Sequence, residues 1–171
     1  MAGDPGVTFT RGRDLAAVGL VAAVVGFLLV LAGYSSLPPL PRLAGLVPAL
    51  LGVGEAIVGH GFRARIQDSA DRRPDGTPIG AAPGPSRRPL PPLTAARALM
   101  AAKATSLAGS ALLGLWVGLL AYVWPRSAQV LAAAADTPSA LVGVAGALVM
   151  VGGGLYLEHC LRAPDAGRPG R

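Results

Sequence analysis

The stretch from Leu93 to Trp124 reads LTAARALMAAKATSLAGSALLGLWVGLLAYVW and decides the fold. An apolar run of this length can cross the roughly 30 Å of hydrocarbon in a bilayer, because a helix rises about 1.5 Å per residue. Lys103 lies inside the run and is the only lysine in the chain. A lysine here favours an interaction inside a helix bundle, with a side chain that reaches the membrane surface as the alternative.

The composition agrees with a membrane protein. The chain has 171 residues, of which 52% are hydrophobic and 14% charged, and this is too apolar for an ordinary soluble domain. The formal net charge is +6, but the arginines flank hydrophobic runs. We therefore expect them to face a lipid bilayer, and we expect no nucleic-acid partner. Cys160 is the single cysteine, which excludes an intrachain disulfide.

Three further runs have the length of a membrane span. Residues 15–34 contain no charged residue, residues 43–62 follow a short proline-rich turn, and residues 140–161 follow Thr137 and Pro138. Threonine followed by proline is typical of a helix start, so we expect the fourth helix to begin there. A secretory signal is the alternative for residues 15–34, but its apolar part would be shorter.

The segments outside these runs are polar or rich in proline and glycine. Residues 1–14 and 162–171 are predicted to be disordered tails, residues 63–92 a disordered cytoplasmic loop, and residues 127–135 a short surface helix. Thirteen of the fifteen basic residues fall on one side of the predicted spans. The positive-inside rule therefore places both termini in the cytoplasm.

The predicted fold is an all-α integral membrane bundle of four transmembrane helices, with the N and C termini cytoplasmic. The four spans are residues 15–34, 43–62, 93–124 and 140–161. Such a chain would be a multi-pass protein of the inner, or plasma, membrane.

Glycines recur at seven-residue spacing in the first two spans, and this spacing places each set on one helix face. Small residues let helices approach closely in lipid, so we expect these faces to pack the first two spans against each other. Chance spacing in a glycine-rich chain is the alternative. The predicted helix-packing glycines, with two from the third span, are Gly19, Gly26, Gly33, Gly45, Gly52, Gly59, Gly114 and Gly118.

Three charged residues fall inside the predicted spans at similar depth. Glu55 lies about 12 Å inward from Arg63, Lys103 about 9 Å inward from Arg97, and Glu158 about 6 Å inward from its flanking arginine. Unpaired charge in hydrocarbon is costly, so we predict an intramembrane charge cluster of Glu55, Lys103 and Glu158, with Arg97 beside it. A cluster that only fixes helix register and one that relays protons or ions are both open.

The remaining reactive side chains give weaker signals. His60 and His159 are predicted to be ordinary interfacial residues, and a metal site that combines them with Glu158 has no recognisable spacing. We expect Cys160 to pack among apolar neighbours, with lipidation as the alternative. No nucleophile with a base and no phosphate-binding loop occurs, so we expect no enzyme, no cofactor and no metal.

Two stretches resemble a known family. PPLTAARALMAAKATSLAGSALLGLWVG, residues 91–118, and LYLEHCLRAP, residues 155–164, are similar to motifs of the actinobacterial domain of unknown function 3180 family. The resemblance implies a four-helix inner-membrane protein without an established activity. Arg97, Lys103 and Glu158 fall on motif positions, whereas Glu55 is included from its depth alone.

These patterns favour a non-enzymatic assembly or scaffolding component of the bacterial cell envelope. Its partner would be another membrane protein or further copies of itself, which it would contact through its small-residue faces. The alternative is a small oligomeric transporter or proton-coupled channel that uses Glu55, Lys103 and Glu158.

Overall fold

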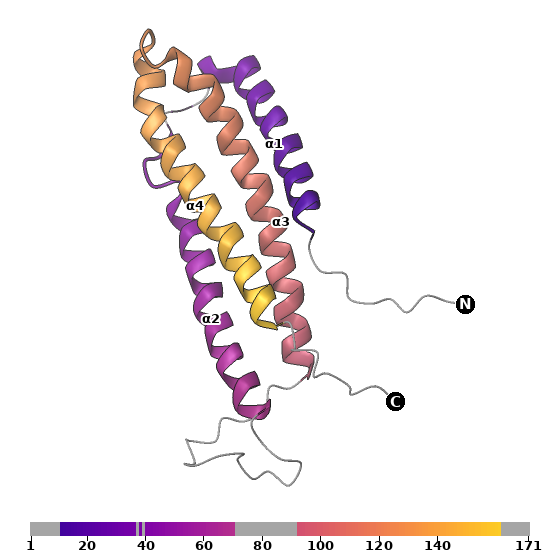
Figure 1. The fold of residues 1–171 in the computed structure, drawn as a ribbon. Helices are drawn as coiled ribbons and strands as arrows, with labels where there is room; N and C mark the ends of the chain where they lie inside the picture. Colours follow the sequence, from indigo (N-terminus) through magenta and orange to yellow (C-terminus); the bar gives the residue numbers. More distant parts are fainter. Residues whose placement is uncertain (1–10, 37, 39, 71–91, 162–171) are drawn as a thin grey trace, which may run out of the picture.

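Helices make up the part of the chain that the computed structural model describes, which is residues 11–36, 38, 40–70 and 92–161 (Figure 1). These residues contain four α-helices and no strand, so the all-α prediction is confirmed for them. The helices are α1 (Gly12–Gly33), α2 (Leu46–Ala70), α3 (Pro92–Val123) and α4 (Leu131–Leu161), with short 3-10 turns at Tyr34–Ser36 and Trp124–Arg126.

The helices pack as a row in the order α1, α3, α4, α2 (Figure 1). Extensive contacts join α1 to α3, α3 to α4 and α4 to α2, so α3 and α4 form the centre of the row. The expectation that the first two helices pack against each other was therefore wrong. The chain turns back after α1 as predicted, but it crosses over the central pair and places α2 on the far side of α4.

Glycine contacts fix the direction and register of the outer pairs. A methyl group added to Gly153 of α4 would overlap the backbone of Gly52, and one added to Gly146 would overlap that of Gly45. From the second pair to the first, the residue numbers rise by seven in both segments, so α2 and α4 run parallel. Gly114 of α3 meets the backbone of Gly19, and Gly118 meets that of Ala23 further along, so α1 and α3 also run parallel.

Three of the four helices are long and apolar enough to cross a membrane. These stretches are Gly12–Ser36, Leu93–Arg126 and Leu131–Leu161, and the search covered the described residues. The predicted second span does not join them. Its helix carries Glu55, His60 and Arg63 together with several glycines, so its apolar content is lower than that of the other three.

Three helices extend clearly beyond their predicted limits. Helix α1 begins at Gly12 instead of residue 15, so residues 12–14 of the predicted disordered tail 1–14 are helical. Helix α2 continues to Ala70 instead of ending at residue 62, so the first part of the predicted loop 63–92 is helical. Helix α4 begins at Leu131, nine residues before residue 140. Residues 1–10, 71–91 and 162–171, on which the other predictions of disorder fall, lie outside the described residues.

The predicted helix start at Thr137 and Pro138 was wrong for a local reason. Thr137 lies inside α4, where its hydroxyl donates to the carbonyl oxygen of Ala133 at 2.7 Å instead of capping a helix end. Pro138 has no N–H for the hydrogen bond of its turn. The alanine-rich sequence before it has a high helix propensity, so residues 131–135 of the predicted surface helix 127–135 belong to α4, whereas residues 127–130 are not helical.

Alanine at a contact glycine should weaken the α2–α4 pair. We expect Gly52→Ala and Gly153→Ala to lower stability by about 1–3 kcal/mol each, because the added methyl group has backbone atoms in its place. Gly54→Ala and Gly152→Ala are matched controls, since nothing lies within 4 Å of a methyl group there. Thermal unfolding in detergent measures the difference, and equal midpoints for contact and control variants would contradict this register.

Candidate functional site

Glu55 lies where α2, α3 and α4 meet around Gly154, and Lys103 and Glu158 lie within about one helical turn of that point in their own helices. A methyl group placed on Gly154 would lie 3.3 Å from Oε2 of Glu55 on α2. It would also lie 3.0 Å from the carbonyl oxygen of Ala102 and 3.0 Å from the backbone nitrogen of Ser106, both on α3. The missing side chain at Gly154 therefore makes room for the carboxylate of Glu55 between the three helices.

The residues around this junction are shielded from solvent. Glu158 lies one helical turn beyond Gly154 and is 2% exposed, and Ser106 is fully buried. The hydroxyl of Ser106 donates to the backbone oxygen of Lys103 at 3.0 Å, which places the lysine on the same turn of α3. Lys103 and Glu158 each have an interaction partner in the structure.

Glu55 contributes a carboxylate from α2 to this junction. Its side chain is half-buried, but Oε2 is inaccessible and has no hydrogen-bond partner among the described residues. A buried carboxylate oxygen without a partner is costly, and such groups are often retained for function. Arg97 is exposed on α3 outside this junction.

Of the eight predicted helix-packing glycines, seven lie against a neighbouring helix. Gly19, Gly26, Gly114 and Gly118 lie in the contact between α1 and α3, and Gly45, Gly52 and Gly59 lie against α4. Gly33 has open space where a side chain would lie. The sequence analysis missed Gly146 and Gly153, although they show the same seven-residue spacing that identified the others.

A second polar centre lies at the opposite end of the row, and the sequence analysis did not identify it. Asp136 of α4 is 7% exposed. One carboxylate oxygen accepts a hydrogen bond from the hydroxyl of Tyr34 at 2.8 Å, and the other accepts one from the backbone N–H of Leu40 at 3.2 Å. The hydroxyl of Ser139 donates to the carbonyl oxygen of Leu40 at 3.4 Å. These bonds fasten the connection between α1 and α2 to α4.

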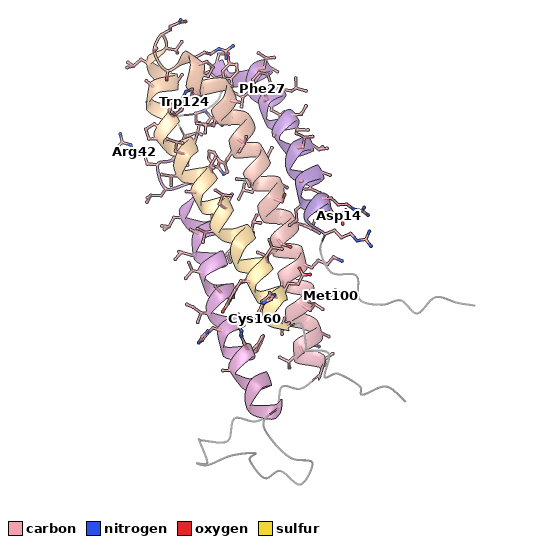
Figure 2. All side chains as sticks on the ribbon, viewed as in Figure 1. Asp14, Phe27, Arg42, Met100, Trp124 and Cys160 are labelled. Carbon is pink, nitrogen blue, oxygen red and sulfur yellow. The ribbon has the colours of Figure 1, made fainter. Side chains whose placement is uncertain are left out.

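Aromatic side chains surround this second centre, and Figure 2 shows Phe27 and Trp124 at that end. The ring of Tyr122 lies 5.3 Å from that of Tyr34 and 6.2 Å from that of Phe27, between centroids. The guanidinium of Arg126 lies 3.9 Å from the centre of the Tyr122 ring and donates to the Tyr122 carbonyl oxygen at 3.0 Å. One basic side chain of this end is thereby held against the protein.

The described residues contain no group of three histidine, cysteine, aspartate or glutamate side chains that could hold a metal ion. His60 and His159 are exposed, whereas Cys160 is buried. Figure 2 shows Cys160 near the end of α4. The alternative metal site of His60, Glu158 and His159 is therefore not formed in the described part of the chain.

One comparison with known proteins identifies a protein family that matches this chain. The family described as "Protein of unknown function (DUF3180)" matches residues 15–165. Neither the curated proteins nor the solved structures contain a match.

Removing the Asp136 carboxylate should destabilise the crossover. We expect Asp136→Ala to cost about 1–3 kcal/mol, because it leaves the Leu40 N–H and the Tyr34 hydroxyl without their acceptor. Asp14→Ala is the control, since Asp14 and Arg13 are both exposed and their pairing at 3.7 Å contributes little to stability. Thermal unfolding in detergent compares them, and equal midpoints would show that the carboxylate does not hold the crossover.

Proposed function

Because the chain belongs to the DUF3180 family of proteins of unknown function, we propose that it is a multi-pass membrane protein that assembles other membrane components and catalyses no reaction. It lies in the bacterial plasma membrane, with α2 as a fourth crossing and both termini in the cytoplasm. Its partners are another membrane protein or further copies of the chain.

The outer surface of α1 supports the membrane placement. Every exposed side chain between Ala16 and Leu31 is apolar, and Leu20 is 69% exposed. A continuous apolar surface of this size is rare on proteins in water and is the normal lipid-facing surface of a membrane helix. Helix α2 fits the same placement, because its carboxylate at Glu55 faces α4 instead of the outside.

The open row is the observation that carries the scaffolding proposal. Helices α1 and α2 lie at its two edges, and each makes its extensive contacts with one neighbour. Their other faces expose large apolar side chains, including Val24 and Leu28 on α1 and Leu50 and Ile57 on α2. In lipid, a partner helix can pack beside either edge without rearranging the central pair.

A transporter is the second candidate, and the buried Oε2 of Glu55 favours it. A carboxylate oxygen that lacks a hydrogen-bond partner among the described residues is suited to accept a proton or a cation. Its position between α2, α3 and α4 resembles the bundle-interior location usual for ionisable residues in transport proteins. One copy has few helices to enclose a pathway, so transport would require several copies.

A crosslinking and flux experiment separates the two candidates. A photoreactive residue at Leu28, exposed on the edge of the row, should give a stoichiometric adduct in cells with a membrane protein or a second copy. The control is Val30, which is 5% exposed and should give none of these adducts. Scaffolding further predicts no proton flux by the purified protein in liposomes under a pH gradient.

The opposite results would favour transport. Proton flux that is lost in Glu55→Gln and kept in Asp14→Asn would replace the scaffold with the second candidate. An adduct with lipid alone at Leu28 would remove the support for a partner at this edge.

The topology can be tested with two exposed positions at opposite ends of the row. In a Cys160→Ala background, a membrane-impermeant thiol reagent should label Ser36→Cys in intact cells, while Thr94→Cys should react only after the cells are opened. This follows from the bias of basic residues toward the end that holds Thr94. Labelling of Thr94→Cys from outside would reverse the proposed orientation.

A further inference from the structure

Helix α1 provides a depth scale for the proposed membrane. The hydroxyl of Ser110 on α3 donates to the carbonyl oxygen of Leu15, and the hydroxyl of Tyr34 donates to Asp136 of α4. Leu15 and Tyr34 are about 29 Å apart along the helix, close to the roughly 30 Å of hydrocarbon in a bilayer. The level of Tyr34 and Asp136 therefore marks the outer boundary of the membrane, and the level of Ser110 marks the inner one.

Helix α2 begins well inside these boundaries, part-way along α4 (Figure 1). A methyl group on Gly45, the residue before α2, would overlap the backbone of Val142. Val142 follows Asp136 by six residues of α4, which correspond to about 9 Å of depth. The outer part of the second crossing is therefore formed by the crossover between α1 and α2, and α2 supplies only the inner part.

The same level can be followed across the row to α1. Gly143, next to Val142, packs against the ring of Trp116 on α3, and Gly26 of α1 packs against the backbone of Leu115 beside it. The start of α2 therefore lies about level with the middle of α1.

The backbone of the crossover is suited to a place without water. Residues 38, 39 and 41 are prolines, which have no N–H, and the N–H of Leu40 donates to Asp136 at 3.2 Å. The N–H of Ala44 donates to the carbonyl oxygen of Pro41 at 3.1 Å. Backbone N–H groups need such partners in hydrocarbon, so this segment can lie in the outer leaflet.

Arg42 is the charged residue of this segment. It is exposed, and no acidic residue of the described part of the chain pairs with it. Figure 2 shows it on the outer flank of the row, near the end that carries Trp124. The neighbouring side chains of Leu43 and Val47 are 69% and 66% exposed, so the surface next to Arg42 is apolar. Arg126, the other described arginine of this end, is instead held against an aromatic ring.

We propose that Arg42 binds the phosphate of an outer-leaflet phospholipid, whose acyl chains lie against Leu43 and Val47. The proposal rests on the membrane placement of the proposed function. A guanidinium forms two hydrogen bonds to one phosphate, and a charge beside hydrocarbon needs a partner. A phospholipid supplies both the anion for Arg42 and the apolar chains for its neighbours, whereas a free phosphate supplies only the anion.

Fluorescence quenching in nanodiscs tests the proposal. In a Cys160→Ala background, a fluorophore is attached to Leu43→Cys or to Leu28→Cys, a control on α1 that is exposed and lies two residues outward from Gly26. The discs contain phosphatidylcholine with a nitroxide on its headgroup. We expect this lipid to quench the fluorophore more strongly at position 43 than at position 28, and we expect Arg42→Gln to reduce the excess about fivefold.

Two further variants test the role of the guanidinium. Arg42→Lys should keep part of the excess, because it retains the charge without the paired hydrogen bonds. Arg13→Gln removes an exposed arginine from the opposite end and should leave the excess unchanged. Equal quenching at the two positions, an excess that persists in Arg42→Gln, or one lost equally in Arg13→Gln would overturn the site.

The remaining measurements separate the lipid from other occupants. Loss of the excess on adding inorganic phosphate would assign the site to a free anion, and the same excess with a water-soluble nitroxide would assign it to water. A nitroxide on the acyl chain checks the membrane placement. If it quenches neither position, the membrane placement fails together with the site. If it quenches at Leu28→Cys while the headgroup excess is absent, only the lipid site fails.

Discussion

Close backbone contact at glycine, between helices that run in the same direction, is the constraint on which the rest of this structure depends. Apolar side chains gain little by leaving lipid for a helix interface, so helices in a membrane associate through tight packing and polar contacts. The contacts of Gly52 with Gly153 and of Gly114 with Gly19 supply that packing on the two sides of the row. These contacts fix which helices are neighbours. They also place the Glu55 carboxylate of α2 beside Gly154 of α4.

The same register explains both polar centres. Gly154 follows a contact glycine directly, and the space that it leaves admits the Glu55 carboxylate beside α3. At the other end, the crossover from α1 to α2 must pass the start of α4, where Asp136 accepts hydrogen bonds from Tyr34 and Leu40. The centre at Glu55 therefore lies between packed helices. The centre at Asp136 holds the connection that leads from α1 across to α2.

The sequence predicted features that depend on a pattern along a whole helix. It predicted less well the features that depend on one contact between distant residues. Apolar length predicted the four helices, and seven-residue spacing identified glycines such as Gly52 that lie against a neighbour. The pattern shows that a face is smooth but not which helix covers it, so the packing of α1 on α3 and α2 on α4 was not predicted. Asp136 was missed because its partners, Tyr34 and Leu40, are about a hundred residues away in the chain. The predicted start of α4 was wrong because the pair Thr137–Pro138 has the sequence of a helix start, whereas the Thr137 hydroxyl bonds to Ala133 inside the helix.

The crossover has a consequence for biogenesis. A ribosome delivers α1 and α2 first, yet the extensive contacts of each are with a helix that is synthesised later. In the proposed membrane placement, their glycine faces meet only lipid or the insertion machinery during that interval. The two early helices must therefore stay apart, without collapsing into a hairpin, until α3 and α4 enter between them. In that placement, the packing order requires α3 and α4 to enter between two helices that are already present, which differs from adding one helix after another to a growing edge.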